Sequence, residues 1–133
     1  MPGIEDKLDA SLFIEELLRE AARNAGMRSI FITENPVKYP DDIAALQLRG
    51  AIKPTQEWAA QEPVVAIFRL KANNDIYIDT LGWNNGYKGY YTEEIINIAE
   101  PNSIDRITEL IKKILQDPDN LIPGHVVHLR GTS

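Results

Sequence analysis

Carboxylate and amide side chains gather in three separate segments of this sequence, and their oxygen atoms are the ligands that calcium prefers. The segments are residues 34–42, 73–75 and 117–120. Calcium takes about six to eight oxygen ligands, so no single segment fills its coordination shell. We therefore predict a calcium site assembled from separate loops, with backbone carbonyls completing the shell. The predicted ligands are Glu34, Asp41, Asp42, Asp117 and Asp119.

None of these segments is an EF-hand loop. If that pattern begins at Asp117, its sixth position is Ile122, where the pattern needs glycine. Its twelfth position is His128, where the pattern needs glutamate. Turns and helix caps are the simpler explanation of each segment taken alone, because Asn and Asp side chains bond readily to nearby backbone. The calcium prediction therefore depends on the loops converging in the fold.

Zinc and catalytic chemistry have less support in the sequence. His125 and His128 are three residues apart, a spacing that sends them to opposite faces of a strand. The chain has no cysteine, so thiolate metal sites and disulfides are excluded. No serine lies in a nucleophile-elbow pattern, and no glycine-rich loop leads into a helix. A carboxylate pair for acid–base catalysis stays open, because there are 20 acidic residues, but we expect no enzyme.

Four aromatic residues surround a tight turn predicted at Asn85-Gly86. Tryptophan and tyrosine supply large, rigid contact surfaces, so the alternative function is a module that binds a protein partner. An immunity protein or an adaptor of bacterial origin fits this description. Cross-strand packing within a sheet is the simpler explanation of the same residues. They are Trp83, Tyr87, Tyr90 and Tyr91.

The composition limits the class of protein. The chain has 133 residues and a net charge of −6, with a pI near 4.9, and its length fits a single domain over residues 1–133. The acidity argues against a nucleic-acid partner and favours a basic protein partner. No apolar run approaches the roughly 18 residues of a membrane span. The start of the sequence lacks a signal-peptide pattern, so we expect a cytoplasmic protein without a membrane partner.

Hydrophobic periodicity predicts two long helices and several strands. The helical stripes cover Ile4–Ala25 and a segment that begins at Ser103. For Ile43–Leu48 a short helix ended by Gly50 is favoured over a strand from Ala45 to Ile52. The predicted strands are 28–33, 64–71, 76–83 and 87–91, with an edge strand at 125–129 and a flexible tail at 129–133. For the strand at 87–91, an extension through 95–98 stays open.

The strands 64–71, 76–83 and 87–91 are predicted to form an antiparallel meander, because residues that favour turns separate them. If Ala72 and Ile76 close the first turn, Leu70 faces Ile78 and Phe68 faces Thr80. Arg69 then faces Asp79 on the other side of the sheet, where the two can form an ion pair. The predicted fold is therefore α+β: a single domain of two long helices packed on a mainly antiparallel β-sheet with a central meander.

The overall profile resembles that of non-EF-hand calcium-binding proteins of filamentous cyanobacteria. This resemblance is carried by a small, acidic, cysteine-free chain and by the loops 34–42, 73–75 and 117–120. It implies a calcium buffer that acts during the differentiation of nitrogen-fixing cells and whose degradation releases free calcium. It also implies one stronger site and a weaker, more exposed one, without assigning ligands residue by residue.

Overall fold

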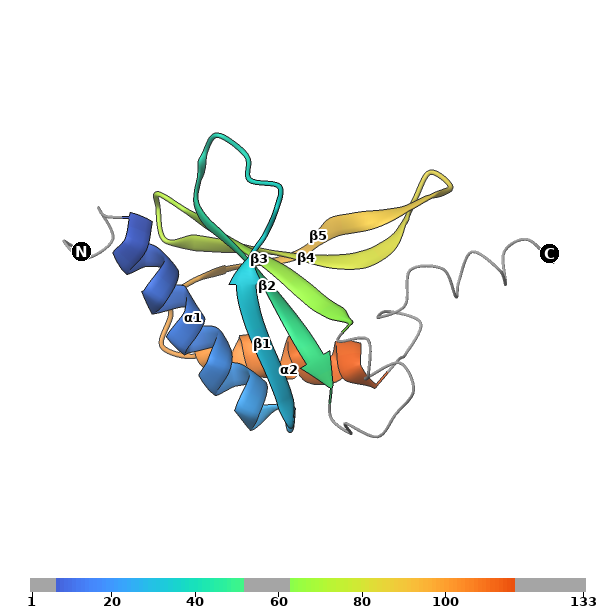
Figure 1. The fold of residues 1–133 in the computed structure, drawn as a ribbon, viewed down its shortest axis with the longest axis horizontal. Coiled ribbons are helices and arrows are strands. Elements are labelled where there is room, and N and C mark those ends of the chain that lie inside the picture. The colour runs from blue at the N-terminus through green and yellow to red at the C-terminus, as the bar shows by residue number, and fades with distance from the viewer. Residues whose placement is uncertain (1–6, 52–62, 117–133) are drawn as a thin grey trace.

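In the described part of the chain, five antiparallel strands form one sheet and lie in it in the order of the chain (Figure 1). The structure is a computed structural model in which residues 7–51 and 63–116 are described. One helix precedes the strands and another follows them. The elements are α1 (Lys7–Asn24), β1 (Ser29–Glu34), β2 (Asp42–Ala51), β3 (Val64–Lys71), β4 (Asp75–Asn84), β5 (Tyr87–Asn97) and α2 (Ser103–Leu115).

The predicted fold, two long helices packed on a mainly antiparallel sheet with a central meander, is wrong. α2 has only 13 residues, and strand exceeds helix in the described chain. The meander is the whole sheet instead of its centre, since all five strands follow one another through antiparallel pairs. The excess of strand comes from β2 and from β5, which runs for 11 residues. Hydrophobic periodicity in the sequence does not reveal how far a strand continues along the neighbour with which it pairs.

The short helix expected over Ile43–Leu48 is also wrong, because this segment lies in β2. β2 pairs with β1 on one side and with β3 on the other, so tertiary pairing decides a segment whose local preference is ambiguous. Gly50 does not end a helix. It lies in β2 with a φ of +139°, where a Cβ atom would overlap the carbonyl oxygen of Ser29. This glycine therefore permits the close approach of β1 to β2.

Both helices pack against the same face of the sheet, which we call the helix face. Alternating strand residues enter the core there, as expected for a sheet with one covered face. The opposite face of the sheet, which we call the outer face, carries the other half of each strand. Fully buried core residues include Ile14 and Leu18 of α1, Ile107 and Ile111 of α2, and Leu48, Phe68 and Ile78 of the sheet.

The two hairpin turns lie where the sequence predicts them, but the register between β3 and β4 differs from the predicted one. Asn74, Asn85 and Gly86 adopt positive φ angles of 69°, 52° and 82°. The first turn is closed by the Asn74 amide, which donates to the Lys71 carbonyl at 3.0 Å, so β4 already begins at Asp75. Leu70 consequently pairs with Ile76 instead of Ile78. The shift is two residues, so every side chain keeps its predicted face of the sheet.

The β4–β5 hairpin extends beyond its neighbour β3. Pairing between β3 and β4 ends at Ile67 and Asp79, whereas pairing between β4 and β5 continues to Asn84 and Tyr87. Figure 1 shows the tip of this hairpin projecting from the body of the sheet. The aromatic residues around Asn85-Gly86 are therefore carried on an arm.

Neither described helix is both long and apolar enough to cross a membrane. The strand predicted at 125–129 and the tail predicted at 129–133 lie outside the described residues.

Candidate functional site

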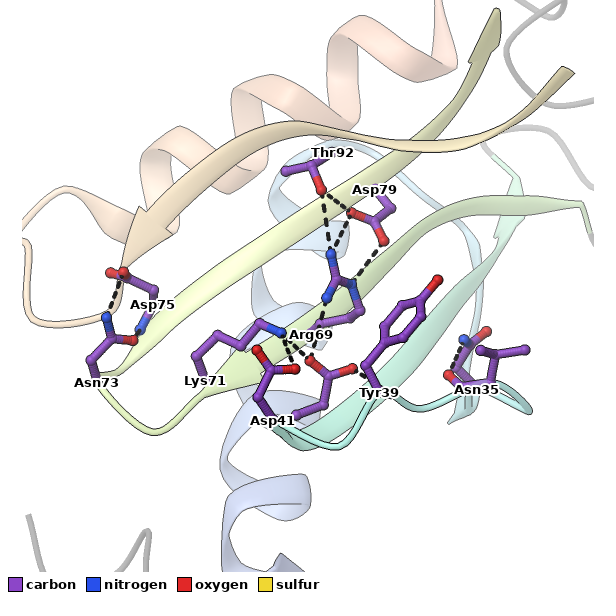
Figure 2. A network of polar contacts seen from close by, with 11 residues as sticks. Asn35, Tyr39, Asp41, Arg69, Lys71, Asn73, Asp75, Asp79 and Thr92 are labelled. Carbon is purple, nitrogen blue, oxygen red and sulfur yellow. Dashed lines mark hydrogen bonds and ion pairs between the residues drawn. The ribbon is translucent and has the colours of Figure 1, made fainter. Parts of the chain in front are cut away.

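Arg69 lies at the centre of a polar network on the outer face (Figure 2). Its Nε donates to Asp79 Oδ2 at 2.8 Å, and its Nη1 donates to Asp42 Oδ1 at 3.3 Å. Its Nη2 donates to Asp79 Oδ1 at 3.4 Å and to Thr92 Oγ1 at 3.3 Å. The predicted ion pair between Arg69 and Asp79 is thus confirmed, although it joins residues that are diagonal neighbours instead of direct partners. One guanidinium therefore links β3, β4, β5 and the start of β2.

Asp42 is the buried acceptor of this network. Its side chain is 0% exposed, and its Oδ1 also accepts a hydrogen bond from Lys71 Nζ at 2.5 Å. Its Oδ2 accepts a hydrogen bond from the Tyr39 amide at 3.0 Å. Asp41, the neighbouring residue, points to solvent and contacts the same Lys71 Nζ at 3.0 Å. The Asp42 carboxylate thereby fixes the loop that precedes β2 to the middle of the sheet.

Two tyrosine rings lie close to the two cations of this network, Arg69 and Lys71. The Arg69 guanidinium carbon lies 5.1 Å from the centre of the Tyr39 ring and 5.3 Å from that of Tyr77. Lys71 Nζ lies 4.9 Å from the centre of the Tyr77 ring. Cation–π contacts of this kind restrict the side chain as well as stabilise its charge. Arg69 is consequently held by hydrogen-bond acceptors and by contacts with two tyrosine rings.

The network raises the pKa of both cations. Burial alone would lower the pKa of Lys71, but its hydrogen bonds to Asp42 and Asp41 outweigh that effect. Burial would likewise lower the pKa of Arg69, and the Asp79 and Asp42 carboxylates raise it. Both groups therefore keep their positive charge throughout the neutral range.

Titration of the Lys71 amine should make stability depend on pH in alkaline solution. Because its pKa is higher in the folded state than the model value of 10.5, its contribution is complete below that value. The contribution is lost as the pH rises through the raised pKa of the folded protein. We expect the melting temperature of Lys71→Met to lie below that of the wild type at neutral pH. As the pH is raised from there, the difference should begin to narrow above about pH 10.5. A difference that already narrows near pH 8 would contradict this assignment.

Beside Arg69 the outer face contains a pocket of about 350 Å³, which we call the outer pocket. The loop before β2 forms one wall, and residues of β2, β3, β4 and β5 form the rest. Tyr90 is half-buried there, and this burial raises the pKa of its hydroxyl. The volume lies in the range of small-ligand sites, and it also suits one large side chain of a partner. Its lining includes Val37, Tyr39, Gln47, Ile67, Arg69 and Tyr90.

The loop that bounds the outer pocket is held by hydrogen bonds of its own. Asn35 Nδ2 donates to the Val37 carbonyl at 2.6 Å, and Gln47 Nε2 donates to Asn35 Oδ1 at 2.9 Å. Together with the bond from the Tyr39 amide to Asp42, these contacts fix both ends of the loop. The pocket wall is therefore preorganised instead of being shaped only by a ligand.

The four aromatic residues of the hairpin do not form one surface. Trp83 pairs with Lys88, and Tyr90 pairs with Leu81, so both aromatic side chains lie on the outer face, in line with Asp79 and Thr92. Tyr87 and Tyr91 alternate with them and lie on the opposite face of the hairpin, where the Tyr91 hydroxyl donates to the Tyr87 carbonyl at 3.1 Å. Only Trp83 and Tyr90 thus belong to the surface that contains the outer pocket.

Three of the five predicted calcium ligands lie within the described residues. Glu34 is exposed at the end of β1, whereas Asp41 and Asp42 are paired with Lys71. Asp117 and Asp119 lie outside the described residues. Within residues 7–51 and 63–116, no three His, Cys, Asp or Glu side chains form a group that could hold a metal ion. The loop 73–75 is a turn whose Asp75 carboxylate accepts hydrogen bonds from the amides of Asn73 and Asn97.

Comparison with known proteins adds no relative. The chain matches no protein-family model, no curated protein and no solved structure.

Sequence reasoning missed the roles of Tyr39 and Tyr77 and the contacts of Asp42 with Arg69 and Lys71. A signal for the network was present in the sequence of β3, where Arg69 and Lys71 alternate with apolar residues. Two cations at alternate positions of such a strand share one face and need acceptors from neighbouring elements. Which acceptors they find depends on the strand order.

Proposed function

We propose that this chain is a non-catalytic binding module that takes up a protein partner on its outer face. The observation that carries the proposal is that Trp83, Tyr90 and the outer pocket share this face, while both described helices pack on the other. Trp83 is 36% exposed, and Val37 at the pocket wall is 57% exposed. Aromatic anchors beside a preformed pocket are typical of the few residues that supply most binding energy in a protein interface.

The partner is expected to insert one apolar or aromatic side chain into the outer pocket. The pocket offers apolar walls at Val37 and Ile67 and hydrogen-bonding groups at Gln47 and Tyr90. Such a mixture suits a side chain with an apolar body and a polar tip, such as tyrosine. The net charge of −6 favours a partner with an excess of basic residues, which it would attract at long range. A cytoplasmic location belongs to the same proposal.

Photocrosslinking from within the outer pocket followed by calorimetry tests this function. A photoreactive phenylalanine analogue at position 90 should crosslink a specific protein in the native host, which is then purified. We expect Trp83→Ala and Val37→Asp each to weaken its binding by about 10- to 100-fold, as hot-spot residues do. Leu12→Asp is the matched control, because Leu12 is 52% exposed but lies on α1. Equal affinity of the four proteins would contradict the proposal.

Calcium binding by Glu34, Asp41, Asp42, Asp117 and Asp119 stays a separate proposal, and the described contacts give it no support. The cleaner probe of it is Asp41→Asn, because the exposed Asp41 carboxylate can be removed without opening the core. The proposal requires saturable shifts in the amide spectrum when calcium is added, with magnesium as the control. A titration without such shifts would contradict calcium binding, and protein binding would be the remaining proposal.

A further inference from the structure

Within residues 7–51 and 63–116, one edge of the sheet is formed by a strand with few of the features that normally prevent edge-to-edge pairing. β1 is an edge strand of sequence SIFITE, and its pairing with β2 runs without a bulge from Ser29 to Glu34. Within β1 there is no proline and no basic residue. Phe31 is 44% exposed on its outer face. A regular edge strand with an exposed aromatic residue is a template for pairing with another strand.

The opposite edge of the sheet is protected in the usual ways. β5 carries Lys88, Glu93 and Glu94, and its register with β4 shifts next to Ile78. Both acidic residues form ion pairs with α2, at 2.8 Å between Glu94 and Arg106 and at 3.8 Å between Glu93 and Lys113. Charges and bulges on an edge strand oppose pairing with a further strand. The difference between the two edges selects β1 as an interaction surface.

The hydrogen-bonding pattern shows which residues of β1 point to its open edge. The Asn35 amide donates to the Ala45 carbonyl at 2.8 Å, so the odd-numbered residues direct their backbone groups toward β2. The Gly50 amide donates to the Pro63 carbonyl and not to Ile30, its partner in β1, which agrees with this pattern. The even-numbered residues Ile30 and Ile32 therefore direct N–H and C=O groups away from β2.

The sequence around Phe31 is complementary to itself when read in the antiparallel direction. A two-fold axis at Phe31 places Ile30 opposite Ile32 of a second copy and stacks the two Phe31 rings. The same axis places Arg28, which lies in the bend directly before β1, opposite Glu34. Both side chains are exposed, and opposite charges in this position support the pairing. Apolar residues, backbone groups and charges are thus all matched in one register.

We propose that two copies of this chain associate through antiparallel pairing of their β1 strands, with Phe31 at the two-fold axis. The pairs are Arg28 with Glu34, Ser29 with Thr33, and Ile30 with Ile32, each formed twice. The result is a continuous ten-stranded sheet with the helices of both copies on one side. The two outer pockets then lie on the other side, so a dimer would present two copies of the proposed partner site.

Charge exchange at Arg28 and Glu34 tests both the association and its register. We expect the full-length wild-type chain to become dimeric in sedimentation experiments between about 5 and 500 µM, a range that covers a weak interface of one strand pair. Arg28→Glu places two like-charged pairs across the axis, and so does Glu34→Arg. Each variant should dimerise at least tenfold more weakly than the wild type. An equimolar mixture of the two variants should restore association, because every Arg28 then faces Glu34 and every introduced Glu faces an introduced Arg.

Two further variants complete the design. Phe31→Lys should also weaken dimerisation at least tenfold, since lysine on an edge strand opposes pairing. Lys88→Glu on the β5 edge is the matched control and should leave association unchanged. Circular dichroism establishes that each variant is folded. A wild-type chain that stays monomeric throughout the range, or a mixture that does not recover association, would overturn the proposal.

Discussion

Asp42→Asn is expected to lower the free energy of unfolding by about 3–5 kcal/mol, the usual cost of breaking a buried ion pair from one side. The Asp42 carboxylate accepts hydrogen bonds from Lys71, Arg69 and the Tyr39 amide, and its side chain is 0% exposed. Asparagine has the same shape but no charge, and one of its two terminal groups is a donor. The variant would therefore leave Lys71 and Arg69, each 11% exposed, without their shared anion.

Asp41→Asn is the matched control for this experiment. Asp41 is adjacent in the chain and contacts the same Lys71 Nζ, but its side chain is 76% exposed. Water can replace its contact with Lys71, so its removal should change stability little. Urea unfolding monitored by circular dichroism measures both variants. Equal midpoints for Asp41→Asn and Asp42→Asn would show that the network does not support the fold.

Replacing Asp42 should also weaken the binding of a partner in the outer pocket. The loop that carries Val37 and Tyr39 is attached to the sheet through the bond from the Tyr39 amide to Asp42. A variant that remains folded should therefore bind the partner more weakly, although residue 42 does not line the pocket. This effect would distinguish a role in positioning the loop from a role in calcium coordination.

Gly50→Ala is expected to lower the free energy of unfolding by about 2–4 kcal/mol, because two unfavourable terms act together. The φ angle of +139° is one that residues with a Cβ rarely adopt. The added Cβ would also overlap the Ser29 carbonyl oxygen, which belongs to the backbone of β1 and cannot rotate away. β1 would have to move from β2, and its exposed edge would move with it.

Gly82→Ala is the matched control for Gly50. Gly82 also lies within a strand, β4, but no atom outside its immediate neighbours lies within 4 Å of the position a Cβ would take. Alanine there should leave stability unchanged or raise it slightly, because it restricts the unfolded chain. Thermal unfolding of the two variants separates these cases. Similar melting temperatures would mean that β1 and β2 lie further apart than described.

The sequence by itself determined the elements whose signals are local. The periodic stripes identified both helices, and the Asn-Gly pair identified the turn at Asn85-Gly86. The alternation of residues also placed Arg69 and Asp79 on one face of the sheet. This placement is correct although the predicted register is wrong by two residues, because a shift by an even number leaves each side chain on the same face. These features depend on neighbours in the chain, and residue types record such neighbours directly.

Tertiary structure alone decided the features that join distant segments. β2 is a strand because β1 and β3 lie on either side of it, although its residues also suit a short helix. The Asp42 carboxylate accepts hydrogen bonds from Arg69 and Lys71, which follow it by more than 25 residues. Trp83 and Tyr90 share the face of the outer pocket, while Tyr87 and Tyr91 do not, since the paired strands alternate their side chains. Strand order and register set all three, and both are fixed by the packing of the whole sheet.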